Sequence, residues 1–583
     1  MYQLQIIWIN SQKIQTDLNS QDYIYQIAEI CAELGVENAI ICPGSRSAPL
    51  AISFARNRKI NCKLIFDERS AGYIGLGMAQ QTKKTVVLIC TSGTAALNFA
   101  PAVAEAYWQQ IPLLVLTGDR PPEWIGQGDG QTINQNNIYH ANCKASYLIP
   151  VDRTHKDSVW MVEKVLSEAI FKTTESPYGP VHINIPSREP FYPSKNSEDA
   201  TEQKAKTIKA FASQRTLARE QWDEIIALLL ENSKRVIIAG HQLPDFKLNT
   251  VLDSFQDYNF MPLLADVNSN LMGIKNAITN FDLILTSLSD TQKIDFQPDI
   301  LISFGNEFVS KNLKQYLRHY KPKVHLHISE NDNWVDTFQS VTHFVKVSPI
   351  YFFNELMNKT KLTNHKSYVA NWLIINEKIA DNISKFRLKN SYSEISIAQL
   401  VFDQIPRNSI LHLSNSLPVR YANLLSIKDI DVYCNRGTSG IDGCVSTAVG
   451  SAMLTDKFVT LLSGDVAFLY DRNAFWHQYL PTNLRFVIIN NGGGQIFRTI
   501  DGAKDQPELE AYFVGTQKQG MQFIAKEYNL EYIKVSSVEV LKHSLATFYR
   551  KDNKSKILEI EIDGNEALSS LAAFKNYVLK GVN

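Results

Sequence analysis

Short apolar runs alternate with amphipathic stretches along most of this 583-residue chain. Runs rich in Val, Ile and Leu, such as "TVVLIC" (85–90) and "RFVIINN" (485–491), predict buried strands. The stretches between them have the spacing of amphipathic helices, which predicts that helices connect the strands. This alternation is typical of α/β domains whose sheets are mostly parallel.

The predicted strands fall into three groups, separated by polar passages at about 194–209 and 361–393. At about 150 residues per domain, the length also suggests three or four domains. We therefore expect an α/β fold with three tandem doubly wound domains, over residues 1–195, 205–375 and 390–583. The strand-like runs are, in order, "NAIIC", "KLIFD", "TVVLIC", "PLLVLTG" and "VHINI"; then "RVIIAG", "MPLLAD", "LILTSL", "DILISFG" and "KVHLHIS"; then "SILHLS", "DVYCN", "FVTLLSGD", "RFVIINN" and "KILEIEI".

Composition narrows the class of protein. Apolar residues make up 44% and the formal net charge is zero, which favours packed cores and disfavours a general nucleic-acid binder. Seven cysteines without a C-x-x-C pair indicate reduced thiols. No apolar run is long enough for a membrane span, and the first residues lack the pattern of a signal peptide. A cytoplasmic location is expected.

Two neighbouring strands end in polar residues that suit a hard metal ion. In "LLSGDVAFLYD" (461–471) the strand delivers Asp465, and in "RFVIINNGGGQIF" (485–497) the next strand ends at Asn491. The segment 467–480 is predicted to be the crossover helix, so both side chains emerge at the same sheet edge. A carboxylate and an amide oxygen suit Mg²⁺, which completes its shell with water and phosphate oxygens.

A plain structural alternative exists for both residues. Asp465 can cap the helix that follows it, and Asn490-Asn491 can form a turn. The spacing of one βα unit and the glycine run 492–494, which lets a ligand approach the backbone, favour the binding interpretation. The implied ligand is a diphosphate held through magnesium.

Gly464-Asp465 followed by Asn490-Asn491 resembles the cofactor motif of the thiamine diphosphate (ThDP)-dependent enzymes. The resemblance implies a pyrimidine-binding domain, a central domain and a diphosphate-binding domain, in that order. It implies ThDP and Mg²⁺ (or Mn²⁺) as cofactors, with Asp465, Asn491 and Gly493 as the metal site and Gly464 beside it. The chain departs from the usual motif at Val466, where the family has glycine.

ThDP chemistry needs a carboxylate beside N1′ of the aminopyrimidine, because the cofactor itself relays the proton removed from the thiazolium. "CKLIFDERSAGYIGLGMAQ" (62–80) places Glu68 after an apolar strand and at the start of a helix. Glu68 is therefore the predicted catalytic acid. The alternative is that Asp67 and Glu68 only complement the helix dipole.

Six blocks resemble one family closely, the 2-succinyl-5-enolpyruvyl-6-hydroxy-3-cyclohexene-1-carboxylate (SEPHCHC) synthases of menaquinone biosynthesis. The resemblance implies decarboxylation of 2-oxoglutarate and addition of the resulting succinyl carbanion equivalent to isochorismate. It also implies a homodimer or homotetramer, with active sites between the first domain of one chain and the last domain of another. The blocks are "CPGSRSAPL", "FDERSAGY", "GDRPPE", "NSLPVR", "NRGTSGIDG" and "NNGGGQIF".

Both implied substrates are dicarboxylates, which arginine binds well through its planar guanidinium. For any single arginine, a surface ion pair is the common alternative. The resemblance assigns substrate binding to Ser45, Arg46, Arg120, Gln131, Lys311, Ser416, Arg420 and Arg436. It assigns the apolar cofactor wall to Ile441, Ile496 and Phe497, for which ordinary core packing is the alternative. Some relatives carry a second base after the lysine, where this chain has Asn312.

The residues alone leave two other functions possible. Another ThDP-dependent 2-oxoacid decarboxylase or carboligase would share the cofactor motif but need fewer arginines. A nucleotide-binding regulatory protein could use the same sheet edge, but pure diphosphate binding would not need Glu68. "TSGTAALNF" (91–99) lacks the lysine of a phosphate-binding loop and is interpreted as a turn capped by Ser92 or Thr94.

Overall fold

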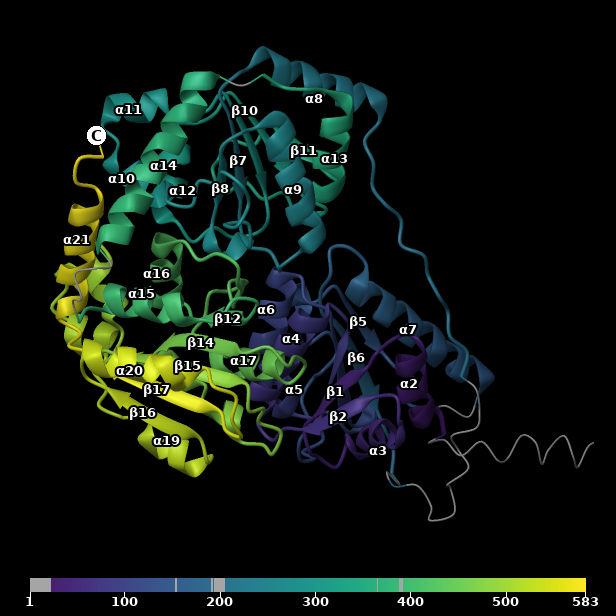
Figure 1. The fold of residues 1–583 in the computed structure, drawn as a ribbon. Helices are drawn as coiled ribbons and strands as arrows, with labels where there is room; N and C mark the ends of the chain where they lie inside the picture. Colours follow the sequence, from purple (N-terminus) through teal and green to yellow (C-terminus); the bar gives the residue numbers. More distant parts are fainter. Residues whose placement is uncertain are drawn as a thin grey trace, which may run out of the picture. The chain divides into compact units, whose positions relative to one another are not determined.

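The computed structural model describes residues 22–152, 155–189, 192, 205–363, 365–386 and 392–582. The prediction that the chain has no signal peptide rests on the first residues, which lie outside these ranges. Most of the first polar passage, at about 194–209, also lies outside them. The described chain forms three sheets of six, five and six strands. All the strand pairs recorded between their strands are parallel, so the predicted α/β fold class is confirmed (Figure 1).

The first sheet has the strand order β2-β1-β3-β4-β6-β5. Helices cover both of its faces, with α2, α3 and α7 on one side and α4, α5 and α6 on the other (Figure 1). The strands are β1 (Asn38–Ile41), β2 (Asn61–Leu64), β3 (Val86–Cys90), β4 (Leu113–Asp119), β5 (Ala145–Leu148) and β6 (Val181–Pro186). The helices are α2 (Asp22–Glu33), α3 (Ala48–Arg56), α4 (Glu68–Thr82), α5 (Thr94–Asn98), α6 (Ala100–Gln109) and α7 (Lys156–Thr174).

The second sheet has the order β11-β10-β9-β7-β8. Its strands are β7 (Arg235–Ala239), β8 (Leu263–Ala265), β9 (Ile300–Phe304), β10 (Val324–Ile328) and β11 (His343–Val345). Its helices are α8 (Arg219–Glu231), α9 (Phe246–Asn259), α10 (Phe281–Ser287), α11 (Asp290–Asp295), α12 (Lys311–His319), α13 (Pro349–Lys359) and α14 (Lys366–Phe386).

The third sheet has the order β13-β12-β14-β15-β17-β16, which repeats the strand order of the first sheet. Its strands are β12 (Ile410–Leu413), β13 (Asp431–Cys434), β14 (Val459–Gly464), β15 (Leu484–Asn490), β16 (Glu531–Val535) and β17 (Lys556–Glu561). Its helices are α15 (Glu394–Gln404), α16 (Leu417–Leu425), α17 (Cys444–Ala452), α18 (Asp465–Tyr470), α19 (Gln522–Glu527), α20 (Val538–Phe548) and α21 (Glu566–Val578).

The structure corrects three predictions about single elements. "LILTSL" is helix α10 rather than a strand, because a short apolar run alone cannot distinguish the two. The strand predicted at "KLIFD" is β2 and already ends at Leu64. The crossover after β14 begins its helix at Asp465 itself, and that helix, α18, ends at Tyr470.

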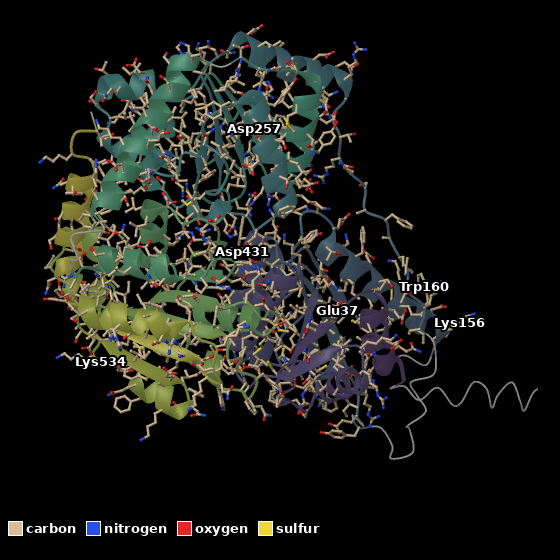
Figure 2. The ribbon with its side chains drawn as sticks, viewed as in Figure 1. Glu37, Lys156, Trp160, Asp257, Asp431 and Lys534 are labelled. Carbon is tan, nitrogen blue, oxygen red and sulfur yellow. The ribbon has the colours of Figure 1, made fainter. Side chains whose placement is uncertain are left out.

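Three edge strands escaped sequence analysis: β5, β11 and β16. Edge strands are often short and partly polar, which protects the open sheet edge from pairing with other chains. In β16, Lys534 forms an ion pair with Glu561 at 2.7 Å, and its side chain lies at the rim of the fold (Figure 2).

The chain divides into two compact units. One holds the first sheet together with two short segments from the last third of the chain, Val449–Leu454 and Asn473–Leu480. The other holds the second and third sheets, whose buried residues form shared apolar clusters.

Candidate functional site

A cavity of about 490 Å³ lies at the carboxyl ends of β14 and β15 in the second unit. The residues just after these strands form its polar wall together with the starts of α15 and α16. This is the edge at which parallel α/β sheets bind ligands. The polar wall consists of Glu394, Asn415, Ser416, Asp465, Asn491 and Gln495.

Asp465 is the first residue of α18 and is almost completely buried. Burial raises the pKa of its carboxyl group, while donors from the Gln517 amide and from the backbone of Val466 and Gly493 oppose that rise. The alternative that Asp465 caps the helix is wrong, because Gly464 occupies the cap position and no side chain makes a cap hydrogen bond there. The contact with Gly493 brings Asp465 to the loop after β15, as the binding interpretation predicted.

Asn491 also lines the cavity, and its two amide atoms have different surroundings. Its Nδ2 donates to Glu394 Oε1 at 2.9 Å. Its Oδ1 is buried and has no hydrogen-bond partner among the described residues. A buried acceptor without a partner is costly unless a ligand satisfies it. Asn491 therefore offers an oxygen ligand at the cavity wall.

Gly493 allows the loop after β15 to pass close to another segment. Its φ of 144° lies in a region that favours glycine, and a Cβ there would come within 2.7 Å of the carbonyl oxygen of Val514. The carbonyl of Gly493 accepts from the Gln495 N–H at 2.9 Å, and a carbonyl oxygen can accept a second contact. Gly493 also lines the cavity, together with Asp465 and Asn491.

These donors match a divalent cation bound to a diphosphate. A carboxylate, an unpartnered amide oxygen and a backbone carbonyl are hard ligands, and three protein oxygens leave positions for water and phosphate. Among the residues that the structure describes, no group of three or more His, Cys, Asp or Glu side chains could hold a metal. That result does not bear on this donor set, which contains a single carboxylate.

Apolar side chains also line the cavity. Ile441, Ile496 and Phe497 are among them, and Phe497 packs against Phe513 with ring centroids 5.7 Å apart. Ile496 also packs against a buried apolar cluster, so the core-packing alternative describes part of its surroundings. A cavity lined by both polar and apolar side chains suits a ligand with a charged tail and an aromatic ring.

The first unit contains its own cavity, of about 550 Å³, which begins where β3 ends. Glu68, Ser92, Gly93 and Gln131 line it. The Ser92 hydroxyl is buried without a partner among the described residues. Gly93 has a φ of 84°, and a Cβ there would lie 3.3 Å from the backbone of Gln131, so this turn also requires glycine. Gly93, rather than Ser92 or Thr94, occupies the cap position of α5, which corrects the sequence interpretation.

Glu68 is the first residue of α4. Burial raises the pKa of its carboxyl group, with a smaller contribution from Asp67, whereas a backbone donor lowers it. Asp67 caps the helix by accepting from the Ser70 N–H at 3.2 Å and also accepts from Asn473 at 2.7 Å. Asp67 thus performs the capping role, which leaves Glu68 available to the cavity.

The two arginines predicted in the first unit are both ion-paired. Arg46 is buried and lies 3.5 Å from Glu189, and Arg120 pairs with Asp129. Burial, and then the charge of Arg120, lower the pKa of Arg46. Ser45 is exposed on the preceding loop. Two neighbouring guanidinium groups concentrate positive charge here, although each has a carboxylate partner.

The predicted substrate residues of the second unit are more dispersed. Ser416 lines the cavity, and its carbonyl accepts from Arg420. Arg436 is buried, donates to Asn415 at 3.0 Å and pairs with Glu307. The exposed Lys311 begins α12 and does not line the cavity. Asn312, which follows it, donates to Asp282 and Thr286 within the same unit.

Sequence reasoning missed Glu394 and Gln517, and it interpreted Thr91–Thr94 as a turn without placing that turn at a cavity. Gln517 donates to both Asp465 and Asn490, so it covers the carboxylate at the cavity's polar end. Glu394 starts a helix just after a polar passage and resembles an ordinary first-turn acid in sequence. Only its burial beside Asn491 distinguishes it.

Comparisons with known proteins agree with this geometry. The family model "Thiamine pyrophosphate enzyme, N-terminal TPP binding domain" matches residues 23–138, and "Middle domain of thiamine pyrophosphate" matches residues 198–413. These matches and the site define a thiamine diphosphate-dependent enzyme.

Curated relatives narrow the class to one family. The SEPHCHC synthase of Cytophaga hutchinsonii is 40% identical over 95% of this chain and 98% of its own. Those of Flavobacterium johnsoniae and Porphyromonas gingivalis are 37% and 32% identical, over 92% and 97% of this chain and 95% and 98% of their own. The chain belongs to the SEPHCHC synthase family, and the resemblance seen in the sequence is confirmed.

None of the helices in the described ranges combines the length and the apolar character required to cross a membrane.

Proposed function

We propose that this enzyme decarboxylates 2-oxoglutarate and adds the four-carbon unit to isochorismate, yielding SEPHCHC and CO₂ for menaquinone biosynthesis. Membership of the SEPHCHC synthase family supports the product. The observation that carries the cofactor role is the unpartnered Asn491 oxygen in a cavity that also contains Asp465. Mg²⁺ is the proposed metal, and Mn²⁺ has the same ligand preferences.

Within the second unit, Asp465, Asn491 and the Gly493 carbonyl would hold the metal and, through it, the diphosphate. Gly464 forms the adjoining backbone, and Ile441, Ile496 and Phe497 would orient the ring system on the apolar wall and exclude water from it. When bound, thiamine diphosphate supplies the carbon centre that stabilises the negative charge left by decarboxylation.

Glu68 would hold the proton exchanged with N1′ of the aminopyrimidine. Its position in a cavity and the rise of its pKa by burial suit a carboxyl group that exchanges a proton. We propose that the first domain of one subunit supplies Glu68 to the last domain of another, in a homodimer or homotetramer. Sedimentation of the purified protein tests the oligomeric state.

The arginines would recognise the substrate carboxylates. Arg46, Arg120 and Arg436 each have a carboxylate partner, so an incoming carboxylate would have to replace or join that partner. Ser45, Gln131 and Ser416 would add neutral hydrogen bonds, and Arg420 and Lys311 further positive charge. The domain limits 1–195, 205–375 and 390–583 and a cytoplasmic location remain predictions.

Product analysis tests the proposal directly. The purified protein is incubated with ThDP, Mg²⁺, 2-oxoglutarate and isochorismate, and the product is identified by mass. A mass equal to both substrates minus CO₂ supports the proposal, provided that omitting either ThDP or isochorismate abolishes it. Replacing 2-oxoglutarate with pyruvate is the control for the alternative function. Equal turnover of pyruvate would identify a different decarboxylase or carboligase and contradict the proposal.

A further inference from the structure

Glu394 is a buried carboxylate in the cofactor cavity to which the proposed chemistry gives no role. Only 1% of it is exposed, and it is the first residue of α15. Its Oε1 accepts from Asn491 Nδ2 at 2.9 Å, and its Oε2 accepts from the Tyr421 hydroxyl at 2.7 Å. Both oxygens therefore act as acceptors, and the partners are side chains at the cavity wall.

These contacts fix which way the Asn491 amide points. A side-chain amide has a donor end and an acceptor end of similar size, and rotation by half a turn exchanges them. A carboxylate can only accept, so the NH₂ group must face Glu394 and the oxygen must lie on the far side. The far-side oxygen is the buried Oδ1 that has no partner among the described residues.

We propose that Glu394 is the positioning residue of the metal site: it holds Asn491 with its oxygen available to the divalent cation. The inference rests on the proposed function, because it assigns a role around the same cation. Outer partners of metal ligands commonly fix ligand orientation, and their loss weakens metal binding about 10- to 100-fold. Tyr421 holds the second carboxylate oxygen, so Glu394 itself has one orientation.

A purely structural role for Glu394 predicts different behaviour. Its charge would then only satisfy the start of α15 and the Tyr421 hydroxyl, and its replacement would alter stability without depending on the residue at position 491. A positioning role requires coupling between the two positions. Reciprocal exchange of acid and amide, Glu394→Gln with Asn491→Asp, preserves both the net charge and the hydrogen bond, with donor and acceptor reversed.

The test measures the Mg²⁺ concentration for half-maximal ThDP binding by calorimetry, with no substrate present. Glu394→Gln should raise that concentration at least 10-fold in the otherwise wild-type chain. In the Asn491→Asp background, where two carboxylates would otherwise face each other, Glu394→Gln should lower it. A structural role moves both backgrounds by the same factor, and that result would overturn the proposal.

Glu559→Gln is the matched control. Glu559 is also fully buried, accepts from an Asn amide and a Tyr hydroxyl (Asn490 at 2.6 Å and Tyr532 at 2.7 Å), and does not line the cavity. It should change the half-maximal Mg²⁺ concentration less than about 3-fold, because it reaches the proposed ligand Asp465 only indirectly, through Asn490 and Gln517. An effect equal to that of Glu394→Gln would show that direct contact with a ligand is not what matters, and would overturn the inference.

The titration of the wild-type protein tests the metal site separately from the role of Glu394. If the wild-type protein binds ThDP without dependence on Mg²⁺, both the metal site and the role of Glu394 are wrong. If wild-type binding depends on Mg²⁺ but the two positions are uncoupled, only the role of Glu394 is wrong. Should Glu394→Gln alone fail to fold, the comparison within the Asn491→Asp background decides: tighter Mg²⁺ binding by the double variant supports the proposal, and equal or weaker binding overturns it.

Discussion

The substitution Gly493→Ala adds one methyl group. It should move the loop after β15 away from the geometry in which it is proposed to bind the cofactor. The φ of 144° is unfavourable for alanine, which costs about 1–3 kcal/mol. The new Cβ would also lie 2.7 Å from the Val514 carbonyl oxygen. That oxygen accepts from the Gly494 N–H at 2.7 Å, so moving it away would lose a hydrogen bond of about 1 kcal/mol.

The backbone strain and the lost hydrogen bond together cost about 2–4 kcal/mol in Gly493→Ala. In the free protein the loop can avoid this cost by shifting. Binding would then require the strained geometry, so ThDP affinity in the presence of Mg²⁺ should fall roughly 30- to 700-fold. Calorimetric titration measures this change, with circular dichroism to verify folding. Gly273→Ala is the control, because Gly273 lies in the same unit, outside the cavity, and no atom lies within 4 Å of the position that its new Cβ would take. Affinity of Gly493→Ala within about 3-fold of this control would refute the assignment of the loop.

Three further results are expected. Asp465→Ala should abolish Mg²⁺-dependent ThDP binding in calorimetry, since it removes the charged ligand; retained binding would contradict the metal site. Glu68→Gln should bind ThDP normally but lose about 10²- to 10⁴-fold in turnover and in deuterium exchange at the thiazolium carbon, followed by NMR; full activity would exclude the proton-exchange role. Burial lowers the pKa of His182 from 6.5 to about 3, so the unfolded chain binds this proton first. His182 should therefore contribute about 1.4 kcal/mol per pH unit to the fall in stability below pH 6.5, and the other histidines whose pKa burial lowers add to that slope. His182→Gln should reduce that slope in urea unfolding at pH 5–6.5 and leave it unchanged above pH 7.5; an unchanged slope at low pH would contradict the assignment.

The pattern of apolar and polar residues predicted those elements that a single segment of the sequence is enough to identify. The central strand β3 is a continuous apolar run and β15 contains one, Phe486–Ile489, whereas the edge strand β16 mixes charged and apolar residues and has no such signal. The run in α10 is too short for its period to be determined. Strand direction likewise placed Asp465 and Asn491 at one cavity, because consecutive parallel strands end at the same edge.

Partnerships between distant segments could not be predicted in the same way. Glu394 and Asn491 are 97 positions apart, and only the folded chain shows that one accepts from the other. The pairing of Arg436 with Glu307 links residues 129 positions apart, and no motif at either end indicates it. The sequence therefore predicted the residue types around the site better than it predicted which of these side chains already have a hydrogen-bond or ion-pair partner.

The identical strand order of the first and third sheets has a consequence for redesign of this enzyme. β3 and β14 occupy corresponding places in the two sheets, and the residues that follow each strand line a cavity: Thr91–Thr94 carry hydroxyls, and Asp465 at the start of α18 carries a carboxylate. The same strand order thus presents different polar side chains at the corresponding place in each sheet. Redesign of either cavity should begin with the residues that follow these two strands and leave the strands themselves intact.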